Sequence, residues 1–251
     1  MAAMTLVFVR APRRWVDRVY VGFARLALRL AGTHVEVHGR EHVRPGSAYV
    51  VVPNHESGWD PVVLVAALAP LPLRLVVKAE TMRTPLLGRA LLWTGNVRVD
   101  RTDTAADVAR VRAAMARRPS DLSVVFYAEG TRSRDGALHA FKTGPFATAI
   151  DQGLPILPVA TAGTRPIWPP DTFAHHRGTV VVEIGPPIPV AGLELEARHA
   201  LRTQAADAVR RLRARARARL RALGGEPGGI DGAVILPFRR TTVAARSGTE
   251  G

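Results

Sequence analysis

Hydrophobic and polar positions follow two alternating periods along this chain, and these periods predict strands interleaved with helices. Short apolar runs rich in β-branched residues predict buried strands over 48–52, 73–78, 96–99, 122–127, 155–160 and 179–184. Helical periodicity occupies most of the intervals, over 60–69, 84–94, 103–118 and 144–152, and a long final helix is expected over 193–223. This order predicts the α/β class, with a mostly parallel central sheet flanked by helices.

An amphipathic helix is expected ahead of the sheet, over 15–31. Its apolar residues recur at helical spacing, and a second stripe is made of four arginines: Arg14, Arg18, Arg25 and Arg29. The pattern is typical of a helix that lies in a membrane interface, and it also fits a helix packed on its own core with a solvated arginine face. We therefore divide the chain into a membrane-interface segment (1–34), a main domain (35–223) and a Gly-rich tail (224–251), in which the apolar run 233–238 is a docking candidate.

The composition excludes several kinds of chemistry and suggests a class of partner. The 251 residues include no cysteine, which rules out disulfides, thiolate metal sites and cysteine nucleophiles. The net charge of +14 predicts attraction to nucleic acid or to an anionic membrane surface. No apolar stretch reaches the roughly 20 residues of a spanning helix, and we find no secretory signal. We therefore expect a peripheral protein on the cytoplasmic face of the membrane, without a transmembrane span.

The end of the long helix, 213–223, reads "RARARARLRAL" and is basic on all sides. Such a run is typical of a solvated helix end, and it also fits contact with anionic lipid or with nucleic acid.

Candidate chemistry begins in the stretch "NHESGWD", which follows the apolar run "AYVVVP". Asp60 precedes Pro61, so it fits the cap of a helix that begins there. His55 lies in the turn before that helix, where the chain can fold back and bring the imidazole to the carboxylate. A carboxylate on one ring nitrogen fixes the tautomer and leaves the other nitrogen free as a general base. The alternative is that Asp60 only caps the helix and His55 is an ordinary loop residue.

Three further stretches carry polar groups or prolines at strand ends. In "VVFYAEGTRSRDG", a strand runs into Glu129, Gly130, Thr131, Arg132 and Ser133. Glycine permits close backbone approach and arginine offers a planar fork that suits a phosphate, although a hydrophilic turn with a Glu–Arg ion pair is the plainer alternative. "GNVRVDR" places Arg98 and Arg101 at another strand end, which could be an exposed edge, and "GLPILPVA" is a strand punctuated by prolines, which could be purely structural.

Taken together and in this order, the four stretches resemble the glycerolipid acyltransferases. The nearest pattern is that of the 1-acyl-sn-glycerol-3-phosphate (lysophosphatidic acid) acyltransferases of bacteria, with their N-H-x4-D, G-x-x-F-I-x-R, F-P-E-G-T-R-S and V-P-I-x-P-V blocks. The matching segments here are 54–60, 95–101, 126–133 and 154–159, and the resemblance covers 35–190. The chain departs from the pattern at Arg98, which replaces an aromatic residue, and around Ala128, where one residue is added and the usual proline is missing.

The resemblance implies a glycerol-3-phosphate acyltransferase-like fold for the main domain and a direct acyl transfer. His55 would take the proton from the free hydroxyl of a lysophospholipid, which attacks the thioester of acyl-CoA or acyl-carrier protein, while Asp60 stabilises the imidazolium. The acceptor's phosphate would be held by Arg101, Gly130, Thr131 and Arg132, with Glu129 orienting the arginines and Lys78 as a lesser candidate. Supporting roles fall to Asn54, Ser57 and Ser133. The resemblance implies no cofactor beyond the acyl donor and no metal, and His175 and His176 have no spaced carboxylate that would make them ligands.

Two alternatives stay open at this point. The same chemistry could serve another lyso-lipid acceptor, such as lyso-ornithine lipid. More remotely, the charge could belong to a nucleic-acid-binding protein, although no aromatic residues interleave with the arginine run and no nucleic-acid-binding motif is found. Within the family resemblance, the helix over 15–31 and the net charge favour a peripheral enzyme on an anionic membrane, with no specific nucleic acid.

Overall fold

A seven-stranded sheet forms the centre of the computed structural model, which describes residues 12–84, 87–100, 104–172 and 174–225. The strand order is β1-β7-β6-β2-β5-β3-β4. The bounds are β1 Thr33–His38, β2 Val50–Pro53, β3 Leu73–Lys78, β4 Val97–Val99, β5 Ser123–Val125, β6 Ile156–Ala162 and β7 Gly178–Ile184. Every neighbouring pair is parallel except β6 and β7. The predicted α/β class with a mostly parallel sheet is confirmed.

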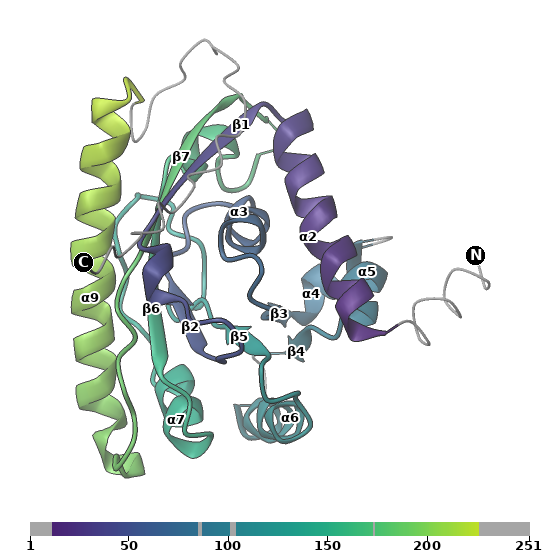
Figure 1. The fold of residues 1–251 in the computed structure, drawn as a ribbon, viewed down its shortest axis with the longest axis vertical. Coiled ribbons are helices and arrows are strands. Elements are labelled where there is room, and N and C mark those ends of the chain that lie inside the picture. The colour runs from purple at the N-terminus through teal and green to yellow at the C-terminus, as the bar shows by residue number, and fades with distance from the viewer. Residues whose placement is uncertain (1–11, 85–86, 101–103, 173, 226–251) are drawn as a thin grey trace, which may run out of the picture.

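Helices cover both faces of this sheet (Figure 1). One face packs against α2 (Arg13–Leu30) and α3 (Asp60–Ala67), and the other packs against α6 (Thr104–Ala116), α7 (Gly144–Asp151) and α9 (Arg198–Ala222). The remaining elements are short: α4 Ala79–Met82, α5 Leu87–Trp93, α8 Thr164–Ile167, η1 Arg40–His42 and η2 Leu195–Ala197. Both faces of β2 are buried, with Val51 in one core and Val50 and Val52 in the other. This explains why a continuous apolar run predicted the strand.

The structure differs from the sequence prediction at three elements. Strand β1 was not predicted, although Val35 and Val37 alternate with polar residues, and the boundary placed at residue 34 cuts through this strand. Helix α4 was not predicted either; it packs so closely on α5 that a Cβ on Gly88 would lie 1.8 Å from the carbonyl oxygen of Met82. The last helix begins at Arg198 rather than at residue 193, because the short 3-10 helix η2 occupies the preceding turn and the leucines at 193 and 195 are exposed.

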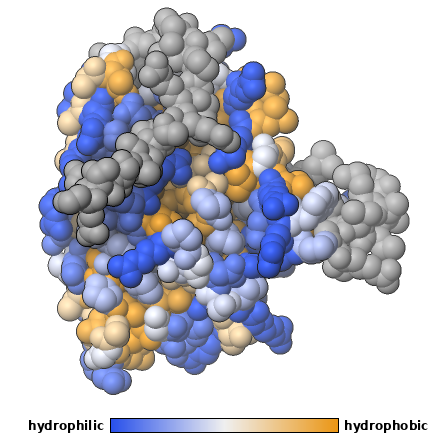
Figure 2. Space-filling view, viewed as in Figure 1, coloured by the Kyte–Doolittle hydropathy of each residue, from blue (hydrophilic) through white to orange (hydrophobic). Residues whose placement is uncertain are grey.

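Helix α2 packs on the core with one face and exposes a mixed second face. Val16, Ala24 and Leu28 are buried. Asp17 forms an ion pair of 2.8 Å with Arg74 on β3, and Arg13 forms one of 2.6 Å with Asp121. The exposed apolar residues are Trp15, Val19, Phe23, Leu26 and Leu30, and four arginines lie next to them in sequence. Apolar and charged side chains consequently lie side by side along this part of the surface (Figure 2).

No helix in the described part of the chain has both the length and the apolar content that crossing a bilayer requires. The residues of the N-terminal segment before residue 12 and the apolar run 233–238 lie outside the described residues.

Candidate active site

Parallel pairing brings the polar stretches predicted from the sequence to one edge of the sheet. Strands β2, β3, β5 and β6 run in the same direction, so their carboxyl ends meet at this edge. The turn 54–60 follows β2, the loop 129–139 lies beyond β5, and β6 contributes Thr161 near its last residue. The carboxyl edge of the strands is where open α/β sheets bind ligands.

The turn folds back and brings the imidazole of His55 to the carboxylate of Asp60, as the sequence predicted. Nδ1 of His55 lies 2.8 Å from Oδ2 of Asp60. The same oxygen accepts hydrogen bonds from the backbone N–H groups of Glu56, at 2.7 Å, and Ser57, at 2.8 Å. Asp60 is fully buried, whereas the side chain of His55 is 16% exposed. The imidazole is therefore anchored on its inner side and reachable from outside.

Asp60 itself occupies a different position from the one expected of a cap. The cap residue of α3 is Trp59, and Asp60 is the first residue of the helix. Its Oδ2 faces back to the N–H groups of the preceding turn, where it accepts three hydrogen bonds, rather than to the helix's own first N–H groups. This is the acceptor-only pattern of an ionised carboxylate, so the hydrogen between Asp60 and His55 belongs to Nδ1. The tautomer follows from this network, and it leaves Nε2 with a free lone pair.

Nε2 of His55 has no hydrogen-bond partner among the residues that the structure describes. The imidazole ring stacks on the ring of Tyr127, with centroids 3.9 Å apart and planes inclined by 27°. Burial raises the pKa of the Tyr127 hydroxyl well above its usual value, and the charge of Asp60 acts in the same direction. The side chain of Tyr127 is therefore uncharged, and its ring limits the rotation of the imidazole.

Two backbone contacts attach the loop after β5 to His55. The N–H of His55 donates to Oε1 of Glu129 at 2.8 Å, and its carbonyl oxygen accepts from the N–H of Ser133 at 2.7 Å. The second carboxylate oxygen of Glu129 accepts from the N–H of His139, also at 2.8 Å. Burial raises the pKa of Glu129, while these two N–H groups and the two histidines act to lower it. Glu129 therefore bonds backbone groups, and its expected contact with Arg132 is absent from the described part of the chain.

Asn54, Ser57 and Ser133, which the sequence analysis assigned supporting roles, form hydrogen bonds that hold the turn and the neighbouring loop. Asn54 is buried and exchanges two hydrogen bonds with the backbone of Thr161, of 2.8 and 3.1 Å. The hydroxyl of Ser57 donates to the carbonyl oxygen of Trp168 at 2.7 Å. Ser133 donates to Asp135 at 2.9 Å, and the bonds from Ala137 N–H and Ser133 lower the pKa of Asp135 to about 2.

The residues expected to bind the phosphate differ in exposure and in their place in the fold, and one of them is not described. Gly130 has a φ of 80°, which favours glycine, and a Cβ there would lie 2.9 Å from Cε of Lys142. Thr131 is exposed, and the partly exposed Arg132 lies 3.4 Å from Asp171. Lys78 ends β3, which neighbours β5. Arg101 lies outside the described residues.

Several residues of the site were missed in the sequence. Tyr127 and Glu56 lie inside quoted motifs, but nothing in the sequence shows which groups they contact. Thr161 directly follows the proline-punctuated strand, which is a signal that could have found it. Arg213 and Arg217 are four residues apart and each follows a buried position of α9, so they flank its inner face.

His175 lies against two tryptophans instead of polar ligands. Its ring centroid is 5.0 Å from that of Trp59 and 6.4 Å from that of Trp168, and burial lowers its pKa, as does the neighbouring His176. Within the described ranges, no group of three or more His, Asp or Glu side chains is arranged to hold a metal ion.

The fold and the His55–Asp60 pair define an α/β protein with a paired histidine and carboxylate at the carboxyl edge of its sheet. The sequence model of the family described as "Acyltransferase" matches residues 34–162. A 1-acyl-sn-glycerol-3-phosphate acyltransferase of Pseudomonas aeruginosa is 31% identical over 190 residues, which cover 73% of this chain and 70% of that protein. The chain belongs to the acyltransferase family.

For two other relatives with this name, the match covers less than two thirds of their length. The 1-acyl-sn-glycerol-3-phosphate acyltransferase of Limnanthes douglasii is 34% identical over 164 residues, and the alpha form of Homo sapiens is 32% identical over 176 residues; each match covers 65% of this chain. The aligned parts span 57% and 58% of these two proteins. The crystal structure of the 1-acyl-sn-glycerophosphate (LPA) acyltransferase of Thermotoga maritima has a TM-score of 0.70 at 24% identity, over 84% of this chain and 86% of that one, which shows the shared fold.

Replacement of Glu129 tests whether both of its oxygens are needed as acceptors. In Glu129→Gln, one carboxylate oxygen becomes an NH2 group that faces a backbone N–H, of either His55 or His139. We expect a loss of roughly 1–3 kcal/mol in the free energy of unfolding, because a buried donor is left unsatisfied. Urea denaturation measures this loss. The exposed Glu194→Gln is the control, and equal stability of the two variants would contradict the assignment.

Proposed function

We propose that this protein transfers a fatty acyl group from a thioester donor to the free hydroxyl of lysophosphatidic acid and so forms phosphatidic acid. The observation that carries the proposal is the His55–Asp60 pair of 2.8 Å, in which the carboxylate is fully buried and the imidazole is reachable. The names of the relatives support lysophosphatidic acid as the acceptor.

The proposed reaction needs one base and no covalent enzyme intermediate. Nε2 of His55 takes the proton of the acceptor hydroxyl while the hydroxyl oxygen attacks the carbonyl carbon of the thioester. Collapse of the tetrahedral adduct breaks the carbon–sulfur bond, and the proton on Nε2 passes to the leaving thiolate. Asp60 stabilises the imidazolium that exists between these two proton transfers. The hydroxyl of Ser57 already donates to Trp168, which supports a structural role for this serine instead of a nucleophilic one.

Arginines close to this edge are the proposed phosphate ligands. Arg132 lies in the loop that is bonded to His55, and its ion pair with Asp171 is long, at 3.4 Å, and partly exposed. An incoming phosphate can therefore replace Asp171 at little cost, since exposed ion pairs contribute at most about 1 kcal/mol. Arg101, Thr131 and Lys78 complete the proposed set. The donor is either acyl-CoA or acyl-carrier protein, and neither requires a further cofactor in this mechanism.

The same proposal places the protein at a membrane surface, because acceptor and product are lipids. Phe23, Leu26 and Leu30 of α2 are 63%, 54% and 79% exposed, although the opposite face of the helix is packed. An exposed apolar stripe flanked by arginines suits the boundary between lipid headgroups and acyl chains. We therefore propose that α2 is both part of the folded domain and the membrane-contacting element.

The first test measures thiol release from oleoyl-CoA in the presence of lysophosphatidic acid, with a thiol-reactive dye. The chain has no cysteine, so the dye reports only the released CoA. We expect His55→Ala to lower kcat by roughly 10²- to 10⁴-fold, the usual contribution of a general base. The exposed His199→Ala, at the start of α9, is the matched control. Release that persists in His55→Ala, or that occurs equally without the acceptor, would show that the reaction is a different one.

The second test concerns the α2 stripe. Phe23→Ser with Leu26→Ser should weaken binding to vesicles of phosphatidylcholine and phosphatidylglycerol by about tenfold or more, because two large apolar side chains no longer enter the lipid. Val108→Ser with Leu223→Ser is the control, since each of these residues is 52% exposed but neither lies on α2: Val108 belongs to α6 and Leu223 is the residue after α9. Co-sedimentation measures the difference. The same loss in both double variants would argue against α2 as the contact element.

A further inference from the structure

An ion-pair cluster lies directly behind the catalytic turn. The side chain of Glu56 is only 2% exposed, and its Oε1 lies 2.6 Å from Nε of Arg213 and 3.5 Å from Nη2 of Arg217. Asn54 donates to the same oxygen at 3.1 Å. Both arginines belong to α9, and Arg213 is 157 positions from Glu56 in the sequence. A helix from the end of the domain thus reaches the residue next to His55.

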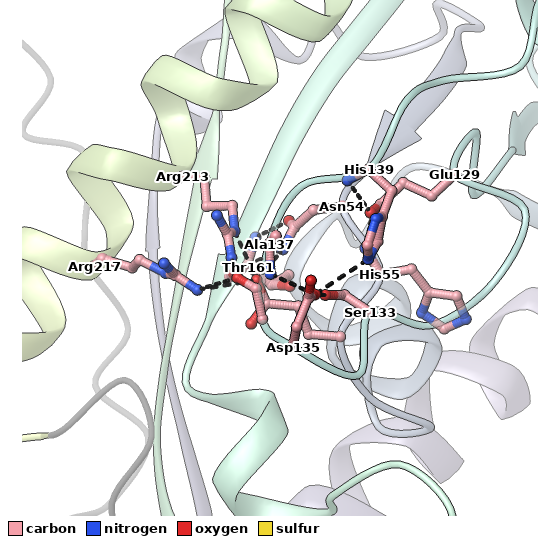
Figure 3. Close-up of polar contacts among 12 residues, drawn as sticks. Asn54, His55, Glu129, Ser133, Asp135, Ala137, His139, Thr161, Arg213 and Arg217 are labelled. Atoms are coloured by element: carbon pink, nitrogen blue, oxygen red, sulfur yellow. Dashed lines mark hydrogen bonds and ion pairs between the residues drawn. The ribbon is translucent and has the colours of Figure 1, made fainter.

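The same two arginines also hold the loop that follows β5. The carbonyl oxygen of Gly136 accepts hydrogen bonds from Arg213 and from Arg217, the latter at 2.8 Å. Figure 3 shows both arginines extending from α9 toward Asn54, Ala137 and Thr161. Burial lowers the pKa of Arg217, and the neighbouring Arg213 adds to this effect. The two guanidinium groups lie together because both contact the carboxylate of Glu56 and the carbonyl oxygen of Gly136.

These contacts complete a closed arrangement around His55. On one side, the turn and the loop are joined by the backbone bonds of His55 to Glu129 and Ser133. On the other side they are joined through Glu56, the two arginines and Gly136. The backbone N–H groups of Glu56 and Ser57 are two of the three donors to Oδ2 of Asp60, so a displacement of Glu56 also displaces the carboxylate that orients the imidazole.

We propose that Glu56, Arg213 and Arg217 are positioning residues for the acyl transfer proposed above, on which this inference rests. None of the three needs to touch the substrate. They fix the turn relative to the loop after β5, so that Nε2 of His55 faces the acceptor hydroxyl held by that loop. Buried ion pairs are weak evidence for stability, because apolar replacements are often as stable. Their position next to the general base favours a role in geometry.

Helix α9 supplies a matched control for this proposal. Six residues after Arg213, Arg219 places its Nε 2.6 Å from Oε1 of Glu183, which is likewise buried, and Arg215 lies 3.7 Å from its other oxygen. Glu56 and Glu183 are thus each contacted by two arginines of α9, and in each case the shorter nitrogen–oxygen distance is 2.6 Å. Glu183, however, belongs to β7, and its described polar contacts include neither the turn nor the loop. The comparison separates the loss of a buried ion pair from the loss of position at His55.

The test compares Glu56→Gln and Arg213→Gln with Glu183→Gln and Arg219→Gln. All four variants should unfold at lower urea concentrations than the wild type. Only the first two should lower kcat, by roughly 10- to 100-fold, as expected when a reacting group is misplaced by about 1 Å, and KM should change little. The double variant of Glu56 and Arg213 should be no slower than the single variants, since one network is lost. Equal kcat losses in the two pairs of variants would overturn the proposal.

A second readout does not depend on turnover. In an NMR spectrum of the 15N-histidine-labelled protein, the signal of the His55 Nδ1 proton should shift or broaden in Glu56→Gln and remain unchanged in Glu183→Gln. If the wild type releases no thiol, the acyl-transfer proposal fails, and this spectrum still decides the positioning role. An unchanged His55 signal in Glu56→Gln would overturn that role. Arg217→Gln, which removes the longer and more exposed contact, replaces any variant that does not fold.

Discussion

A single oxygen atom, Oδ2 of Asp60, is the point on which the arrangement of this site depends. It accepts from the imidazole of His55 and from two backbone N–H groups, in a position that excludes water. A buried carboxylate is tolerated only when such donors surround it, because an unpaired buried charge is very costly. The turn must therefore fold back on the first residue of α3, and in doing so it presents the imidazole at the edge of the sheet.

The surrounding elements hold this turn from three directions. Asn54 ties it to Thr161 on β6, the loop after β5 bonds both backbone groups of His55, and α9 reaches Glu56 from the far face of the sheet. The side chain of Tyr127 limits the ring from one side. His55, the proposed general base, is thus placed mainly by backbone and ion-pair contacts of neighbouring segments, and this kind of preorganisation lowers the cost of orienting a reacting group.

The sequence predicted the features that depend on local pattern and missed those that depend on distant contacts. The strands around Val50 and Ile156 were found because both of their faces are buried, and the His55–Asp60 pair was predicted because a strand-to-helix turn can fold back on itself. The arginine run of α9 was interpreted as a solvated end or a surface for lipid or nucleic acid. In the structure, Arg213 and Arg217 face the buried Glu56, whereas Arg215 and Arg219 reach the buried Glu183 and stay 58% and 49% exposed. No sequence pattern shows which carboxylate, 157 positions away, an arginine will meet.

The most direct test of the account is the protonation state of the His55 ring in the free protein. Long-range 1H–15N spectra of 15N-histidine-labelled protein distinguish the two neutral tautomers, and the His55→Ala spectrum assigns the signal among the 8 histidines. At a pH at which the ring is neutral, the account predicts a protonated Nδ1 and an unprotonated Nε2. In Asp60→Asn this preference should be lost. A proton on Nε2 in the wild type would contradict the account, because the nitrogen assigned as the base would have no lone pair to accept the substrate's proton.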